Sequence, residues 1–103
     1  MQIFNLQDKV VVITGGTGVL GSELARGLAE AGARVVILGR DPAKRDQIVG
    51  EITHKGGRAM GILCDVLEKD SLISAREQII AQYGTIDILI NGAGGNRKNA
   101  TTS

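Results

Sequence analysis

The sequence predicts an α/β fold, a partial doubly wound arrangement in which helices cover both faces of one parallel sheet. Short β-branched apolar runs alternate with longer segments of helical periodicity, and glycines mark several strand-to-helix junctions. Strands joined through helices in this way form right-handed crossovers and lie parallel. We therefore expect four strands in the spatial order 3-2-1-4, whereas a complete doubly wound sheet has about six.

The first strand is expected over Lys9–Thr14, because Val10 to Ile13 is a continuous β-branched run typical of a strand buried on both faces. A glycine-rich segment then ends the strand, and a helix is expected over Val19–Ala31. Gly32 follows as a residue suited to a left-handed helix end. The apolar residues at helical spacing in this helix are Leu20, Leu24, Ala25 and Leu28.

The second strand is expected over Arg34–Leu38, and the next helix begins at Asp41-Pro42. The Asp41 side chain can cap the helix, and proline suits the first helical position. Ile48 and Ile52 share a face of this helix, which ends at Gly56-Gly57.

A third strand is expected over Arg58–Cys64, although Gly61 is a weak strand former, and a third helix is expected over Lys69–Tyr83. Gly84 ends that helix, and the fourth strand follows over Ile86–Ile90. Beyond Asn91 the residues are small and polar, as in a loop. The third helix carries an apolar stripe of Leu72, Ala75, Ile79 and Tyr83.

Length and composition exclude several classes of protein. The 103 residues suffice for one domain, the net charge of +1 gives no basic surface for nucleic acid, and no apolar run is long enough to span a membrane. The N-terminus lacks the pattern of a signal peptide. The single cysteine, Cys64, fits a buried structural thiol in a reducing cytoplasm. His54, the only histidine, lies near a helix end and is expected to be solvated.

The segment Thr14–Gly21 indicates a site for a dinucleotide pyrophosphate. Glycines in a strand-to-helix turn let backbone approach phosphate, and the helix N-terminus offers free N–H groups and partial positive charge. Three further segments follow carboxyl ends of strands: Gly39–Asp41, Asp65-Val66 and Asn91–Gly95. Each could be an ordinary turn, but together at one sheet edge they predict a cofactor groove.

From about Phe4 to Gly95 the chain resembles the short-chain dehydrogenase/reductase family, whose fold is a Rossmann sheet. Leu6–Val10 is similar to the family's opening before its first strand. Asp65-Val66 resembles its Asp-Val, whose carboxylate meets the adenine amino group. Asn91-Gly92-Ala93-Gly94 resembles its Asn-Asn-Ala-Gly, which supports the sheet and borders the cofactor, although Gly92 replaces the second asparagine.

The glycine turn departs from the pattern Thr-Gly-x-x-x-Gly-x-Gly of the classical members. Val19 occupies the middle glycine position, and Gly18 stands one place earlier. The turn instead fits the Thr-Gly-x-x-Gly-x-x-Gly spacing of extended, sugar-nucleotide-modifying members, while the later motifs resemble the classical ones. The subfamily therefore stays open. The residues expected to bind cofactor are Thr14, Gly15, Thr17, Gly18, Val19, Leu20, Gly21, Gly39, Arg40, Asp65, Val66, Asn91, Gly92, Ala93 and Gly94.

The end of the second strand favours NADP(H) over NAD(H), which stays possible. An acid there would hydrogen-bond the 2′-hydroxyl of NAD, whereas an arginine accommodates the 2′-phosphate of NADP. The sequence has Gly39 followed by Arg40, and Asp41 comes late and can serve as a helix cap.

The resemblance implies a catalytic tyrosine four residues before a lysine, with a serine upstream. The tyrosine would exchange a proton with the substrate while hydride moves to or from the nicotinamide. Tyr83, the only tyrosine, is followed four places later by Asp87 and is expected in the core. We therefore assign no catalytic residue and no metal site, and expect residues 1–103 to be the N-terminal part of one NAD(P)-binding domain, inactive alone because the catalytic part is absent. The expected parent oxidises an alcohol or reduces a ketone, with a polyol or sugar acid favoured.

Two other functions stay open: an epimerase-like extended member, and a non-catalytic nucleotide-binding or regulatory module. A Tyr-x-x-x-Lys downstream of Ser103 would discriminate an enzyme from a binding module. The fourth strand is expected to be an unprotected edge, so the chain is expected to self-associate.

Overall fold

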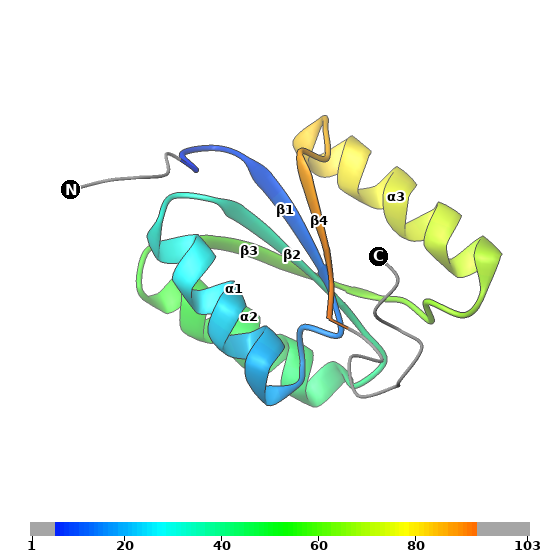
Figure 1. Cartoon of the computed structure of the whole chain (residues 1–103), viewed down its shortest axis with the longest axis horizontal. Helices are drawn as coiled ribbons and strands as arrows, with labels where there is room; N and C mark the ends of the chain where they lie inside the picture. The colour runs from blue at the N-terminus through cyan, green and yellow to red at the C-terminus, as the bar shows by residue number, and fades with distance from the viewer. Residues whose placement is uncertain (1–5, 93–103) are drawn as a thin grey trace.

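A computed structural model describes residues 6–92, in which four strands alternate with three helices. The strands are all parallel and lie in the order β3-β2-β1-β4 (Figure 1), which confirms the predicted fold class. The strands are β1 (Val10–Thr14), β2 (Arg34–Gly39), β3 (Arg58–Leu63) and β4 (Ile88–Asn91). The helices are α1 (Val19–Glu30), α2 (Pro42–His54) and α3 (Lys69–Tyr83).

Helices α1 and α2 cover one face of the sheet, and α3 covers the other (Figure 1). β1 lies between β2 and β4, and its five residues are buried, as the β-branched run predicts. Because side chains alternate along a strand, Val11 and Ile13 join the core under α1 and α2, while Val10 and Val12 join the core under α3. The sheet therefore has two apolar cores, one on each face.

Most element boundaries agree with the sequence to within one or two residues, and α3 matches it at both ends. Asp41 caps α2, since its Oδ1 accepts hydrogen bonds from the N–H groups of Ala43 and Lys44. β4 begins at Ile88, later than the expected Ile86. Before Ile88 the contact with β1 is made partly by a side chain: the Val10 N–H donates to the Asp87 carboxylate at 2.8 Å, while the Asp87 N–H donates to the Val10 carbonyl at 2.9 Å.

The buried face of α1 differs from the expected apolar stripe. Leu20 is 81% exposed and Leu24 is also exposed, whereas Ser22, Ala25 and Ala29 are buried against the sheet. These small side chains allow α1 to approach the sheet closely, so the larger leucines point elsewhere. Leu28 is partly buried beside this core. The sequence pattern thus predicted the helix correctly, and its apolar stripe is confirmed at Ala25 and Leu28 and wrong at Leu20 and Leu24.

Elsewhere Cys64 is buried and His54 is exposed, both as expected. Gly32 follows α1 with a φ of 99°, in the left-handed region predicted for it. None of the helices over residues 6–92 combines the length and the apolar character that a membrane crossing requires.

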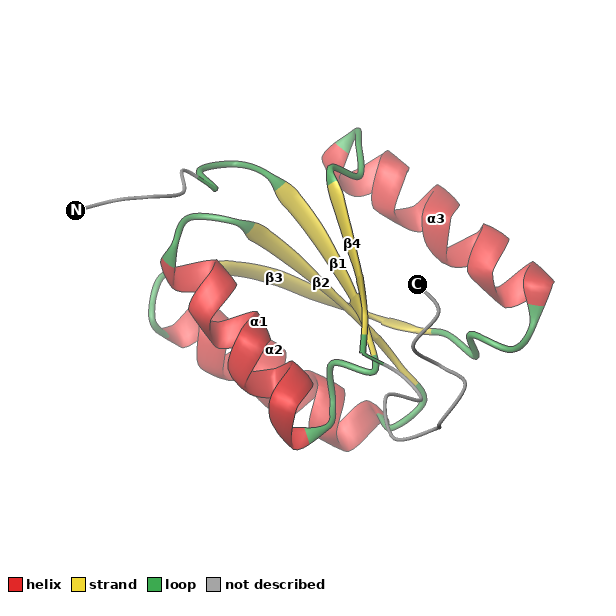
Figure 2. Cartoon of the chain, in the orientation of Figure 1, coloured by secondary structure: helices red, strands yellow, loops and turns green. Residues whose placement is uncertain are grey.

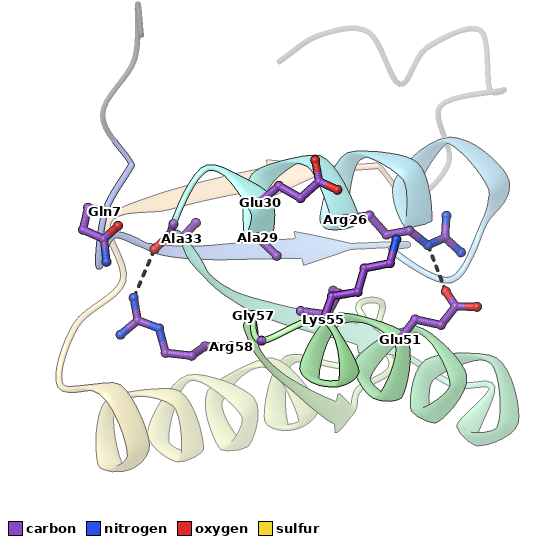
Figure 3. A pocket seen from close by; sticks show the side chains of 12 residues that line it. Gln7, Arg26, Ala29, Glu30, Ala33, Glu51, Lys55, Gly57 and Arg58 are labelled. Atoms are coloured by element: carbon purple, nitrogen blue, oxygen red, sulfur yellow. Dashed lines mark hydrogen bonds and ion pairs between the residues drawn. The ribbon is translucent and has the colours of Figure 1, made fainter.

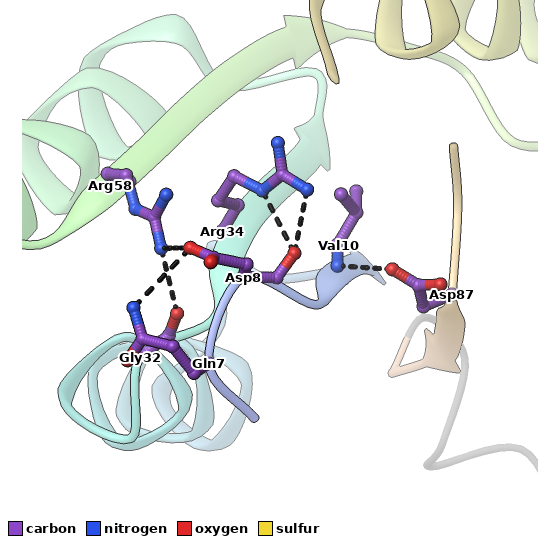
Figure 4. Close-up of polar contacts among 7 residues, drawn as sticks. All are labelled: Gln7, Asp8, Val10, Gly32, Arg34, Arg58 and Asp87. Carbon is purple, nitrogen blue, oxygen red and sulfur yellow. Dashed lines mark hydrogen bonds and ion pairs between the residues drawn. The ribbon is translucent and has the colours of Figure 1, made fainter. Parts of the chain in front are cut away.

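A polar cluster ties the segment before β1 to the amino ends of β2 and β3 (Figure 4). The Asp8 carbonyl accepts two hydrogen bonds from the Arg34 guanidinium, at 2.7 and 3.1 Å. Arg58 donates to the Asp8 carboxylate and to the Gly32 carbonyl. The hydrogen bond from Arg58 holds the pKa of Asp8 below its ordinary value. This cluster stabilises the amino edge of the sheet, which is the edge opposite the predicted cofactor segments.

Candidate functional site

The predicted cofactor segments start from the carboxyl edge of the sheet. Thr14 pairs with Leu38 of β2 and with Asn91 of β4, and Gly39 pairs with Leu63 of β3. Figure 2 shows the loops after β1 and β2 at the same end of the sheet as the carboxyl end of β4. The structure therefore brings the four predicted segments to one edge, although Ala93, Gly94 and Gly95 lie outside the described residues.

The turn after β1 follows directly from its glycines. Gly15 has a φ of 72°, a left-handed conformation that glycine adopts without strain. Its N–H donates to the Leu38 carbonyl at 3.2 Å, and its carbonyl accepts from the Gly18 N–H at 3.2 Å. α1 then starts with a hydrogen bond from the Ser22 N–H to the Gly18 carbonyl at 2.8 Å. The turn is thus closed by its own backbone.

Two glycines allow this turn to pack. A Cβ atom at Gly21 would lie 2.6 Å from the Gly15 carbonyl oxygen and 2.8 Å from Gly16 Cα. A Cβ atom at Gly16 would lie 2.9 Å from Ile37 Cγ2 of β2. Gly16 was absent from the residues predicted to matter, because its role depends on a β2 side chain distant in sequence. Both glycines are required by the fold of the turn itself.

Gly18 differs from these glycines, because nothing in the described chain requires it. Its φ is −75°, and a Cβ atom there would meet only the Gly15 carbonyl oxygen, at an ordinary 3.7 Å. It is the N-cap of α1, a position where a side chain usually accepts from the first-turn N–H groups. No side chain caps α1, and no acid lies in its first turn. The helix N-terminus therefore presents open N–H groups and partial positive charge, which suit an anion.

The turn also contacts the end of β2. A Cβ atom at Gly39 would lie 3.0 Å from Thr17 Cγ2, so the absence of a side chain at Gly39 lets Thr17 come close. Val19 and Leu20, which were predicted to border the cofactor, are exposed beside this turn. Val66 packs partly buried against the core under α3.

A hydrogen bond joins the carboxyl ends of β1 and β4. The Thr14 hydroxyl donates to Asn91 Oδ1 at 2.9 Å, which orients the asparagine that the resemblance singled out. The Gly92 N–H donates to the Thr14 carbonyl at 2.8 Å. A Cβ atom at Gly92 would lie 2.9 Å from that carbonyl oxygen, so this backbone geometry suits glycine in place of the family's second asparagine.

The turn after β2 faces the turn after β3. Arg40 is 73% exposed, and its Nη1 lies 3.9 Å from Asp65 Oδ2, a long ion pair that water screens. The Asp65 backbone is fixed, because its N–H donates to the Ser71 hydroxyl at 2.9 Å and its Oδ1 accepts from the Leu67 N–H at 3.0 Å. Asp41 is engaged in capping α2, as predicted. Arg40 is therefore able to turn toward another anion.

Tyr83 lies at the opposite edge from these segments. Its ring is partly buried and packs 5.1 Å from the Arg34 guanidinium, which belongs to the amino end of β2. Burial raises the pKa of Tyr83 above its ordinary value, the opposite of what a proton-transferring tyrosine needs. Over residues 6–92, no three histidine, cysteine or acidic side chains are grouped as a metal site would require.

A groove of about 700 Å³ lies at the amino edge, between the ends of α1 and α2 (Figure 3). Ala29 and Ile52 contribute apolar surface to the groove. Arg26 and Glu51 also line it and form an ion pair, with 2.9 Å between Arg26 Nε and Glu51 Oε1. The hydrogen bond from Arg26 holds the pKa of Glu51 below its ordinary value. None of the predicted cofactor residues lines this groove. The groove therefore lies apart from the predicted cofactor segments.

Comparison with known proteins identifies the family to which this chain belongs. The family model described as short chain dehydrogenase matches residues 9–103. An oxidoreductase named UxuB from Bacillus subtilis (strain 168) is 51% identical over 98 residues, which cover 95% of this chain and 35% of that protein. The 2-dehydro-3-deoxy-D-gluconate 5-dehydrogenase of Formosa agariphila is 37% identical over 95 residues, covering 91% of this chain and 36% of the enzyme.

Solved structures give the same result. A candidate D-mannonate oxidoreductase from Haemophilus influenza with bound NAD superposes with a TM-score of 0.85 and 43% identity, over 88% of this chain and 32% of that one. A metagenomic short-chain oxidoreductase in complex with NADP has a TM-score of 0.78 and 34% identity, over 84% of this chain and 39% of that one. The chain thus spans about a third of the length of these proteins. It belongs to the short-chain dehydrogenase/reductase family.

Proposed function

We propose that this chain binds a nicotinamide dinucleotide along the carboxyl edge of the sheet, with the pyrophosphate at the N-terminus of α1. The observation that carries the proposal is Gly18, a glycine that neither backbone conformation nor packing requires. Its missing side chain leaves room for a ligand beside uncapped N–H groups. Gly15 and Gly21 shape the same turn, so the backbone itself would hold the phosphates.

Within this groove, Asp65 and Val66 would border the adenine, and Asn91 with the residues after it would border the nicotinamide side. Arg40 would favour NADP(H) over NAD(H) by contacting the 2′-phosphate. No acid at the end of β2 is free to bind the 2′-hydroxyl of NAD(H), because the Asp41 carboxylate already caps α2. NAD(H) is the alternative, and the similar structures include one with each cofactor.

The activity that fits this site is hydride transfer between the cofactor and an alcohol or ketone. The bound nicotinamide supplies the hydride chemistry, while this chain's residues bind and orient the adenosine and pyrophosphate. A sugar acid or polyol is the favoured substrate class, because two similar proteins are named for sugar acids. We further propose that residues 1–103 form the N-terminal part of one dinucleotide-binding domain. Since the sequence contains no Tyr-x-x-x-Lys, we expect binding without turnover from these residues alone.

A second candidate, an epimerase-like extended member, is favoured by one observation. The spacing of Gly15, Gly18 and Gly21 is the one that the resemblance associates with sugar-nucleotide-modifying members. Both candidates use the same nucleotide site, so the test of binding applies to either.

The variant Gly18→Asp tests the pyrophosphate site. An aspartate at this N-cap should preserve or strengthen α1, while its carboxylate would occupy the N–H groups and repel phosphate. We expect NADP⁺ and NAD⁺ to bind at least about 10-fold more weakly, a loss of about 1.4 kcal/mol. Titration of ¹⁵N-labelled chain by NMR suits the roughly millimolar affinity expected when only part of a ligand is contacted.

Gly27→Asp is the matched control, since it adds the same charge to the same helix at a position with nothing within 4 Å. It should leave nucleotide affinity within about twofold, because exposed charges act weakly over such distances. Unchanged affinity in a folded Gly18→Asp chain would show that the phosphates bind elsewhere.

The variant Arg40→Ala tests the cofactor preference. A charge-assisted contact contributes about 1.5–3 kcal/mol, so NADP⁺ should bind roughly 10- to 100-fold more weakly and NAD⁺ almost as before. Equal losses for both cofactors, or a wild type that prefers NAD⁺, would contradict the preference.

A further inference from the structure

Arg45 is a largely buried cation at the end of β2 that none of the sequence motifs includes. It is the fourth residue of α2, and its side chain is 14% exposed, compared with 73% for Arg40. Its stem lies flat on β3, because a Cβ atom at Gly61 would be 2.6 Å from Arg45 Cγ and 2.7 Å from Cδ. The glycine that interrupts the β3 pattern therefore makes room for this arginine.

The guanidinium of Arg45 reaches Gly39, the last residue of β2 and the residue before Arg40. Its Nη1 donates to the Gly39 carbonyl at 3.5 Å, and its Nε lies 3.5 Å from Asp46 Oδ1. Both distances are at the outer limit for hydrogen bonds, and Asp46 is exposed to solvent. A guanidinium has five N–H donors, so these contacts leave most of its capacity unused.

Other anions near this turn are already engaged. The Asp41 carboxylate accepts from two N–H groups of α2, and Asp65 accepts from the Leu67 N–H. Arg45 also lies close to the N-terminus of α2, where the helix dipole disfavours a cation and favours an anion. A cation that is mostly buried without a short ionic contact is costly, and a phosphate beside it would lower that cost.

We propose that Arg45 is a second specificity-determining residue, which contacts the phosphate monoester on the adenosine ribose from the α2 side while Arg40 contacts it from the other. The proposal rests on the proposed dinucleotide site. Gly39 directly precedes Arg40 and its carbonyl accepts from Arg45, and no acidic side chain at this position competes for the two arginines. Arg45 is held in place by Gly61, whereas the exposed Arg40 must be ordered on binding, so Arg45 supplies the preorganised part of the subsite.

The test compares NADP⁺ with NAD⁺, two ligands that differ only by the 2′-phosphate, on the full chain by NMR titration. Arg45→Met keeps an unbranched stem over Gly61 and removes the charge, and Arg45→Lys keeps the charge. We expect Arg45→Met to weaken NADP⁺ binding about 10-fold or more and to change NAD⁺ binding less than about twofold. Arg45→Lys should recover part of the loss. Arg76→Met, which removes an exposed arginine from α3, is the control for net charge.

The outcomes separate this inference from the proposed function. Equal weakening of NADP⁺ and NAD⁺ by Arg45→Met, in a chain whose Tm is unchanged, would show that Arg45 only shapes the turn. If Arg40→Ala lowers NADP⁺ affinity selectively and Arg45→Met does not, the site stands and the role of Arg45 is refuted. If the wild type binds neither nucleotide, both proposals fall. A selective loss with Arg45→Met, recovered by Arg45→Lys, supports the proposal.

Discussion

Replacing Gly21 with alanine should destabilise the protein, although alanine is the better helix former. The new Cβ atom would lie 2.6 Å from the Gly15 carbonyl oxygen, so the turn would have to move about 0.8 Å to reach an ordinary contact of 3.4 Å. Both crowded groups, Gly15 and Gly16, are backbone and cannot rotate away. Overpacking of this kind costs about 1–3 kcal/mol.

Alanine at a helical position gains about 0.5–1 kcal/mol over glycine, which offsets only part of this cost. The net loss of stability for Gly21→Ala is therefore up to about 2.5 kcal/mol. Each kcal/mol shifts the Tm of a domain of this size by about 4–8 °C. Because the displaced turn is also the proposed phosphate site, nucleotide affinity should fall in the same variant.

Gly27→Ala, in the same helix, measures the gain in helix propensity alone, since a Cβ atom at Gly27 would meet nothing within 4 Å. It should raise the Tm by about 2–8 °C and leave nucleotide binding intact. Thermal unfolding followed by far-UV circular dichroism measures both variants. A rise in Tm for Gly21→Ala equal to that for Gly27→Ala would refute the close packing of the turn.

Three further predictions concern other parts of the molecule. Thr14→Val removes the hydroxyl that donates to Asn91, so thermal unfolding should show a loss of about 1 kcal/mol that Thr14→Ser largely avoids. Because the pKa of Asp8 is lowered in the folded state, its contribution is present above the ordinary value of 3.8 and is lost progressively as pH falls from there through the lowered folded-state pKa. Urea unfolding should therefore show that Asp8→Asn costs more stability at pH 6 than at pH 3. The chain should self-associate through the edge of β4, where Leu89 is 65% exposed, and Leu89→Lys should reduce this association in light scattering at high micromolar concentration. A monodisperse wild-type monomer would contradict the last of these.

Local signals in the sequence were enough to predict the sheet and most of its connections. The β-branched run of β1, the Asp41-Pro42 start of α2 and the left-handed Gly32 each depend on residues adjacent in the chain. The convergence of site segments followed from the rule that parallel strands present their carboxyl ends together. Each of these features was confirmed where the structure describes it.

The rest depends on contacts between distant segments. The inward face of α1 could not be read from its leucines, because the distance between helix and sheet selects alanine and serine at the contact. Likewise Gly61 lowers the β propensity of the third strand, and its role depends on how α2 packs on β3. That packing places the Arg45 side chain against Gly61. The bond from Thr14 to Asn91 joins residues 77 positions apart. Hydrophobic periodicity in the sequence does not predict contacts between residues this far apart.

The position of β4 beside β1 has a consequence for the order of folding. Val10 pairs with Arg34 after a loop of about 24 residues, but its contact with Asp87 closes a segment of 77. The longer closure costs about 1 kcal/mol more in chain entropy, and non-local pairing of this kind slows folding. We expect β1 to pair with β2 first and with β4 later. During that interval β1, whose five residues are buried in the folded protein, has one unpaired edge, so refolding at high concentration competes with intermolecular strand pairing.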